Sequence, residues 1–339
     1  MSTEPTIAER IESQAERLHI SIGAVCNNNC IFCMEEDRDA RYVNNSAMTP
    51  DRVRWLLEQH RGAEEVCFTS GEPTTRPELP DFIEWAQSLG YRRISMMTNG
   101  RRAGHMPYAA ALVKRGLNRF YVSIHGHTQR LHEGLTRTPG SFDQTVQGLD
   151  KIAQLKRFGV ELHTSTVVTK RNLPHLGDIY PFLREHGVDQ VVFNVMQANG
   201  RAHTFFDQLF PTYAEIAATF AAFVRACGEP RPQAFLVDIP LCATEEIPDF
   251  NRGYVEKYRH FDLESHTELP VARDAARQGE GRGKGLLLVT RSDLDDYQRV
   301  KRPECARCKH DARCEGVWKN YLSRHGWEGL EPVRAAGSG

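Results

Sequence analysis

Three closely spaced cysteines are the residues of this chain with the clearest capacity for chemistry. Cys26, Cys30 and Cys33 lie within eight consecutive positions. Thiolates at this density bind zinc or the irons of an iron–sulfur cluster. Structural zinc takes four ligands, and a four-iron cluster has four irons to ligate. Three thiolates therefore leave one iron of a cluster open, or zinc takes its fourth ligand from elsewhere. The spacing favours the open cluster.

A second group of cysteines lies near the other end of the chain. Cys305, Cys308 and Cys314 follow the pattern Cys-x2-Cys-x5-Cys, and Cys242 precedes them. Four thiolates are a complete set for one closed site. Zinc and a four-iron cluster both accept four cysteines, so this pattern alone does not choose between them.

The elements that must position the first cysteines alternate regularly between strand and helix. The predicted strands cover residues 18–22, 65–69, 93–98, 120–124, 160–168 and 190–195. The predicted helices cover residues 50–59, 79–89, 109–114, 142–158 and 176–186. Such alternation predicts an α/β fold, with a parallel sheet curved into a partial (β/α)6 barrel inside its helices. The cysteine loop follows the first strand, on the face where such barrels carry active sites. A flavodoxin-like sheet is the competing architecture, but no Gly-x-Gly-x-x-Gly follows the first strand.

The pattern changes after about residue 205. A helix is predicted over 213–227, the polar stretch 262–285 reads as a mobile loop, and residues 286–289 as a short strand. The predicted organisation is a lead at 1–17, a barrel at 18–205, a smaller cluster-binding extension at 206–332 and a disordered tail at 333–339.

Composition excludes several classes of function. The formal net charge of the 339 residues is −1, which argues against general binding of nucleic acid. No apolar stretch has the length of a membrane-spanning helix, and the polar N-terminus does not resemble a secretory signal. These features predict a cytoplasmic protein without a membrane partner. In that compartment nine cysteines indicate metal ligands or redox groups rather than disulfides.

The loop after the second predicted strand strengthens the cluster interpretation. It reads Ser70-Gly71-Glu72-Pro73, an acidic residue beside two flexible ones, which suits recognition of an ammonium group. Together with Cys-x3-Cys-x2-Cys one strand–helix unit earlier, this resembles the radical SAM superfamily, whose motif here is Gly-Gly-Glu-Pro. The resemblance implies that Cys26, Cys30 and Cys33 hold a [4Fe–4S] cluster whose open iron binds S-adenosylmethionine.

The same resemblance implies further contacts to the bound nucleotide. Polar residues at the ends of the third to sixth strands are expected to line its pocket, with Thr166 and Asn194 on one face. We expect His125 and His127, at the end of the fourth strand, to contact substrate or nucleotide or to be exposed, rather than to bind metal. The predicted cofactor-binding residues are Ser70, Gly71, Glu72, Pro73, Thr98, Asn99, Ser123, His125, Arg137, Thr166 and Asn194.

The C-terminal cysteines resemble part of the SPASM or twitch extension of this superfamily, although the full seven-cysteine pattern is absent. The resemblance implies a second, auxiliary [4Fe–4S] cluster at Cys242, Cys305, Cys308 and Cys314, with zinc as the alternative. Cys67 and Cys227 remain. Both are interpreted as structural, with donation of a hydrogen atom to a substrate radical as the sharper hypothesis.

The implied activity is reductive cleavage of S-adenosylmethionine to a 5′-deoxyadenosyl radical that abstracts hydrogen from a substrate. A flavodoxin- or ferredoxin-type donor would supply the electron. A ribosomally made peptide is the leading substrate class. The alternatives are a small sugar, nucleotide or natural-product intermediate, and, in a different class, a non-catalytic metal-binding protein.

Overall fold

The computed structural model describes residues 17–23, 25–34, 49–197, 200–228, 232–251, 258–261, 299–312, 314 and 316–334. The predicted loop over 262–285, the predicted strand over 286–289, nearly all of the predicted lead and residues 335–339 of the tail lie outside this part of the chain.

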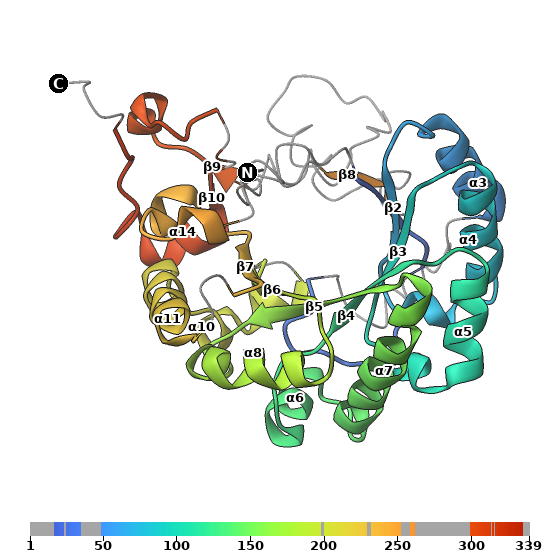
Figure 1. The fold of residues 1–339 in the computed structure, drawn as a ribbon. Coiled ribbons are helices and arrows are strands. Elements are labelled where there is room, and N and C mark those ends of the chain that lie inside the picture. Colours follow the sequence, from blue (N-terminus) through green and yellow to red (C-terminus); the bar gives the residue numbers. More distant parts are fainter. Residues whose placement is uncertain are drawn as a thin grey trace, which may run out of the picture.

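A curved parallel sheet forms the centre of the molecule (Figure 1). Its first six strands occur in chain order and confirm the predicted partial barrel: β1 Arg17–Ser21, β2 Glu65–Thr69, β3 Arg93–Thr98, β4 Arg119–Ser123, β5 Glu161–Val168 and β6 Gln190–Val195. Two strands that were not predicted extend it: β7 Ala234–Val237 pairs parallel with β6, and β8 Tyr258–Phe261 pairs parallel with β1. The described sheet therefore has eight strands, and residues assigned to the extension supply both edges.

Helices cover the outer side of this sheet (Figure 1). They are α3 Pro50–Gln59, α4 Leu79–Ser88, α5 Met106–Lys114, α6 Gln129–Thr136, α7 Ser141–Leu155, α8 Leu176–Glu185 and α11 Tyr213–Ala226. The short α9 Gly200–Thr204 and α10 Phe206–Leu209 precede α11. The sequence did not predict α6, α9 or α10. The sequence of α6 is mostly polar, and its start depends on the Thr128 side chain, which accepts a hydrogen bond from Leu131 N. No helix in the described ranges has the length and apolar character needed to cross a bilayer.

A buried ionic cluster joins the strands at their N-terminal ends. Glu65 of β2 pairs with Arg17 of β1 at 3.2 Å and with Arg119 of β4 at 2.7 Å, and accepts a hydrogen bond from Ser95 of β3. Burial alone would raise the pKa of Glu65, but the two guanidinium groups hold it below its usual value. This ionic cluster thus connects four strands at their N-terminal ends, on the opposite side of the sheet from the cysteine loop at their C-terminal ends.

The C-terminal residues form a small unit beside α11 (Figure 1). β9 Arg299–Val300 and β10 Val317–Trp318 pair antiparallel, and α14 Lys319–His325 follows. The rings of Tyr321 on α14 and Tyr213 on α11 stack with centroids 4.0 Å apart. This contact anchors the small unit to the helical layer.

Candidate metal centres

The first cysteine loop leaves β1 at the C-terminal edge of the sheet and is held there by the end of α6. Asn29 N donates to Thr136 O and to Thr138 Oγ1, both at 3.1 Å. Arg137, between these two threonines, is exposed and has a φ of 51°. Its predicted contact with nucleotide stays a prediction, whereas the residues on either side of it hold the cysteine loop.

Each of the three asparagines between Cys26 and Cys30 is contacted by a side chain from another element. Two arginines and one asparagine supply these contacts, so the loop is held by hydrogen bonds along its length. The pairs are Asn99 Nδ2 to Asn27 Oδ1 at 2.6 Å, Arg101 Nη1 to Asn28 Oδ1 at 2.9 Å, and Arg201 Nη1 to Asn29 O at 3.3 Å.

The thiols of this loop interact electrostatically. Burial raises the pKa of Cys30, and the neighbouring Cys33 and Cys26 raise it further, while Arg201 opposes this shift. Three thiolates close together repel one another unless a cation neutralises them. The donor set therefore fits a cationic metal centre, and Arg201 adds positive charge at the loop.

Glu72 links the loop after β2 to the loop after β3. Its carboxylate is 1% exposed and accepts hydrogen bonds from Thr74 N at 3.1 Å, Thr74 Oγ1 at 2.7 Å, Thr98 Oγ1 at 2.7 Å and Asn99 N at 2.6 Å. The structure thus brings together three predicted site residues, Glu72, Thr98 and Asn99. Recognition of an ammonium group by the same carboxylate stays a prediction.

The backbone before Glu72 turns through the left-handed region. Ser70 has a φ of 73° and Gly71 a φ of 55°. Glycine adopts this conformation without steric cost, whereas serine does not. The geometry explains why glycine suits position 70 and why serine there carries local strain. Pro73 follows within a buried 3-10 turn, η1 Pro73–Thr75.

His125 lies against the cysteine loop. Its ring centroid is 4.5 Å from that of Phe32, and it stacks on His132 of α6. Burial lowers the pKa of His125 well below 6.5, and His132 lowers it further, so the ring is neutral. Ser123, two residues earlier, is half-buried at the end of β4.

The prediction that Thr166 and Asn194 share a pocket face is wrong. In the register of β5 and β6, Thr166 pairs with Phe193 and Val167 pairs with Asn194. Phe193 packs on Phe220 of α11, so Thr166 belongs to the helix-covered face. Its hydroxyl donates to Ile124 O at 2.6 Å and is fully buried. Asn194 instead donates to Ser165 Oγ.

The four C-terminal cysteines meet around one small pocket. Cys242 lies in the 3-10 turn η5 Leu241–Thr244, Cys305 in η9 Pro303–Arg307, and all four line the pocket with His310. Burial raises the pKa of Cys242 to about 12, with further increases from Cys314, Cys308 and Cys305. His310 Nε2 lies 2.8 Å from Glu245 Oε2, so its ring already has a partner. The sulfur donors of the pocket are thus four thiols.

The remaining cysteines lie apart from both groups. Cys67 is fully buried in β2, where burial raises the pKa of its thiol to about 12 and Glu65 adds to this effect. Cys227 caps the end of α11 and is half-buried. Both positions suit structural roles, and hydrogen donation by either stays a prediction.

Sequence reasoning missed the residues that hold the first loop in place. Arg101 directly follows the Thr98-Asn99-Gly100 turn that the sequence did single out. Its position after a strand end was the available signal, because loops at the C-terminal edge converge on the site. Arg201 had no comparable signal, since α9 is short and lies outside the strand–helix pattern.

Comparison with known proteins agrees with this geometry. Residues 20–183 match the model of the radical SAM superfamily. A probable GTP 3',8-cyclase of Metallosphaera sedula is 30% identical over 186 residues, which cover 54% of this chain and 56% of the relative. An AdoMet-dependent heme synthase of Oleidesulfovibrio alaskensis is 27% identical over 202 residues, or 58% of this chain and 50% of the relative. The chain thus spans about half the length of these curated relatives.

The fold has a counterpart that includes the C-terminal region. The crystal structure of Streptococcus suis SuiB bound to precursor peptide SuiA aligns with a TM-score of 0.63 and 16% identity. The alignment covers 96% of this chain and 76% of SuiB. At this identity the likeness concerns the fold.

Proposed function

We propose that this chain, whose residues 20–183 match the radical SAM superfamily, cleaves S-adenosylmethionine reductively. The resulting 5′-deoxyadenosyl radical would take a hydrogen atom from a substrate. The match implies a [4Fe–4S] cluster and S-adenosylmethionine, which supply the radical chemistry when bound. The observation that carries the proposal is the three-cysteine loop, held at the C-terminal edge by contacts from α6, α9 and the loop after β3.

The protein's own residues position and shield this chemistry. Cys26, Cys30 and Cys33 would hold the cluster, and the asparagines between the first two are fixed by hydrogen bonds. Phe32 and His125 pack together beside the loop and limit access of water to it.

We infer that Cys242, Cys305, Cys308 and Cys314 hold a second four-iron cluster. The pocket that these four thiols line supports the inference. Zinc would satisfy the same donors, and metal analysis separates the two.

A peptide is the substrate class we propose. SuiB, which shares the fold across both parts of this chain, was crystallised with its precursor peptide. A nucleotide such as GTP is the second candidate, because the M. sedula relative is named a GTP 3',8-cyclase. The alignment with that relative covers only 54% of this chain, so the similarity supports a nucleotide substrate for the aligned part alone.

Metal and product analysis tests the activity. Protein reconstituted without oxygen should contain about eight irons per chain if both sites hold four-iron clusters. With dithionite and S-adenosylmethionine it should release 5′-deoxyadenosine. Cys30→Ala should abolish this release, whereas Cys305→Ala should lower the iron content to about four per chain and keep the N-terminal cluster. Cys227→Ala is the matched control and should retain all the iron.

Four results would contradict parts of the proposal. Zinc as the only metal, or no 5′-deoxyadenosine from fully loaded protein, would favour a non-catalytic metal protein. Loss of all iron in Cys305→Ala would contradict two separate sites. Consumption of GTP, with no change to peptides encoded beside the gene, would replace the peptide with a nucleotide. Flavodoxin or ferredoxin in place of dithionite tests the electron donor.

A further inference from the structure

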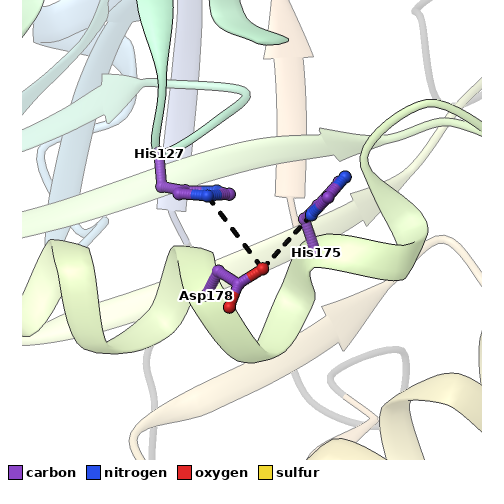
Figure 2. Close-up of side chains that lie close together, drawn as sticks. All are labelled: His127, His175 and Asp178. Carbon is purple, nitrogen blue, oxygen red and sulfur yellow. Dashed lines mark hydrogen bonds and ion pairs between the residues drawn. The ribbon is translucent and has the colours of Figure 1, made fainter.

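A group of metal-ligand side chains lies outside both cysteine sites. His127 belongs to the loop after β4, His175 ends the 3-10 turn η4 Leu173–His175, and Asp178 lies in the first turn of α8. Their ligand atoms all lie within 4.8 Å of one another. Figure 2 shows both imidazole rings directed at one oxygen of Asp178.

The distances are close to those that one ion requires. His175 Nδ1 lies 3.2 Å and His127 Nε2 lies 4.0 Å from Asp178 Oδ2 (Figure 2). Donors bound to one zinc ion at 2.0–2.2 Å lie roughly 3.4 Å apart. His127 Nδ1 has no hydrogen-bond partner among the described residues, so no competing contact holds this ring away from an ion. A small rotation of the His127 ring would shorten the distance between its Nε2 and Asp178 Oδ2 to the value that a shared ion requires.

The donor chemistry selects the kind of ion. Two imidazoles and one carboxylate suit zinc and other divalent transition metals, and leave coordination positions for water. His175 and Asp178 are three positions apart at the start of α8, so their side chains lie on the same side of the helix. We propose that His127, His175 and Asp178 bind a divalent transition-metal ion. His127 is thus given a metal-binding role, contrary to the expectation from its place at the end of the fourth strand.

The position suggests what the ion does. It would connect the loop after β4 to α8, in addition to the hydrogen bond of 3.0 Å that Asn172 Nδ2, directly before η4, donates to His125 O. His125, two residues before His127, packs on Phe32 of the cysteine loop. A bound ion would therefore restrain the loop that carries His125, and the site acts as a clamp at the rim of the barrel.

Zinc titration of the full chain with its iron–sulfur sites loaded tests the proposal. Calorimetry should find one zinc ion per wild-type chain, and His175→Ala and Asp178→Asn should each weaken its binding at least about tenfold. His186→Ala is the matched control. This histidine also pairs with an aspartate, at 2.6 Å from Asp150 Oδ1, but no third ligand was found beside that pair in the described residues.

Hydrogen exchange tests the clamp. Zinc should slow amide exchange over residues 125–131 in the wild type and in His186→Ala, but not in His175→Ala or Asp178→Asn. His175 and Asp178 have side chains that are 44% and 60% exposed, so both variants should fold, which thermal unfolding without zinc checks. Equal zinc affinity in all four proteins, or equal loss in His186→Ala, would overturn the metal site and leave a surface ion pair.

Discussion

The Ser70-Gly71-Glu72-Pro73 motif did not predict the hydrogen bonds that the Glu72 carboxylate accepts. From the sequence, its carboxylate was expected to bind an ammonium group. In the structure, the carboxylate accepts hydrogen bonds from four donors, two in its own loop and two at the end of β3 and in the loop that follows. An acidic side chain that is 1% exposed is stable only when such donors satisfy it. Its hydrogen bonds reach Asn99, which contacts the cysteine loop.

We expect Glu72→Gln to destabilise the protein by about 1–3 kcal/mol. The NH2 group of glutamine would replace a carboxylate oxygen that now accepts a hydrogen bond, and it would be placed against hydrogen-bond donors. Urea denaturation measures this change. Glu78→Gln is the control: Glu78 is 40% exposed and its ion pair within the described residues is with Arg76, so its loss should cost less than about 1 kcal/mol. Equal stabilities of the two variants would contradict the structural role of Glu72.

His132 makes stability depend on pH. Burial lowers its pKa to about 4, and Arg101 adds to this shift. The unfolded chain takes up this proton near pH 6.5, so stability falls as the pH drops from 6.5 toward 4. In His132→Asn the free energy of unfolding should depend less on pH between 4 and 6.5, with a slope that is smaller by at most about 1.4 kcal/mol per pH unit.

Urea denaturation at several pH values between 4 and 7 measures that dependence. His203→Asn, at an exposed position, should keep the wild-type slope. If His132→Asn also keeps it, then the buried histidine is not the group that titrates.

At the scale of elements, the contact between α7 and the loop after β3 sets the position of Asn99 and Arg101. Gly148 on α7 lies so close to this loop that a Cβ there would be 2.1 Å from Gly100 O. Thr145 Oγ1, one turn earlier, donates to Asn99 O at 2.9 Å. The helix therefore supports the loop that holds the first cysteines.

Gly148→Ala should displace α7 and cost about 1–3 kcal/mol, with a lower iron content of the N-terminal site because the supporting loop moves. Gly177→Ala, the same change in α8, has no atom within 4 Å of the added Cβ and should be neutral or stabilising by up to about 1 kcal/mol. Denaturation and iron analysis of both variants measure these effects. Normal stability of Gly148→Ala would mean that the helix adjusts freely.

The sequence predicted the six central strands well because short segments with apolar and β-branched residues alternate regularly with helical patterns. It failed where the decisive contact is distant in the chain. β7 and β8 have four residues each, and their partners β6 and β1 are recognisable only in the folded sheet. Whether Thr166 shares a face with Asn194 depended on the register between β5 and β6, which neither strand's own sequence determines.

At the scale of the whole molecule, the sheet edge and the C-terminal cysteines are connected. β7 ends four residues before the turn η5 that carries Cys242. Asp238, directly after β7, pairs with Arg299 of β9 at 3.0 Å. The two cysteine sites therefore belong to one framework, in which the barrel's edge strand leads directly into the second site.

The region around Cys305, Cys308 and Cys314 has little secondary structure of its own, so a bound metal should contribute much of its stability. We expect Cys305→Ala to accelerate amide exchange over residues 299–316. Protection of β2 to β5 should stay unchanged, because the buried core and the Glu65 cluster hold those strands. Residues 319–325 should change less, since Tyr321 stacks on Tyr213. Cys227→Ala should exchange like the wild type throughout. Unchanged protection of residues 299–316 in metal-free Cys305→Ala would mean that packing alone holds this unit, and that its four thiols are not needed for its fold.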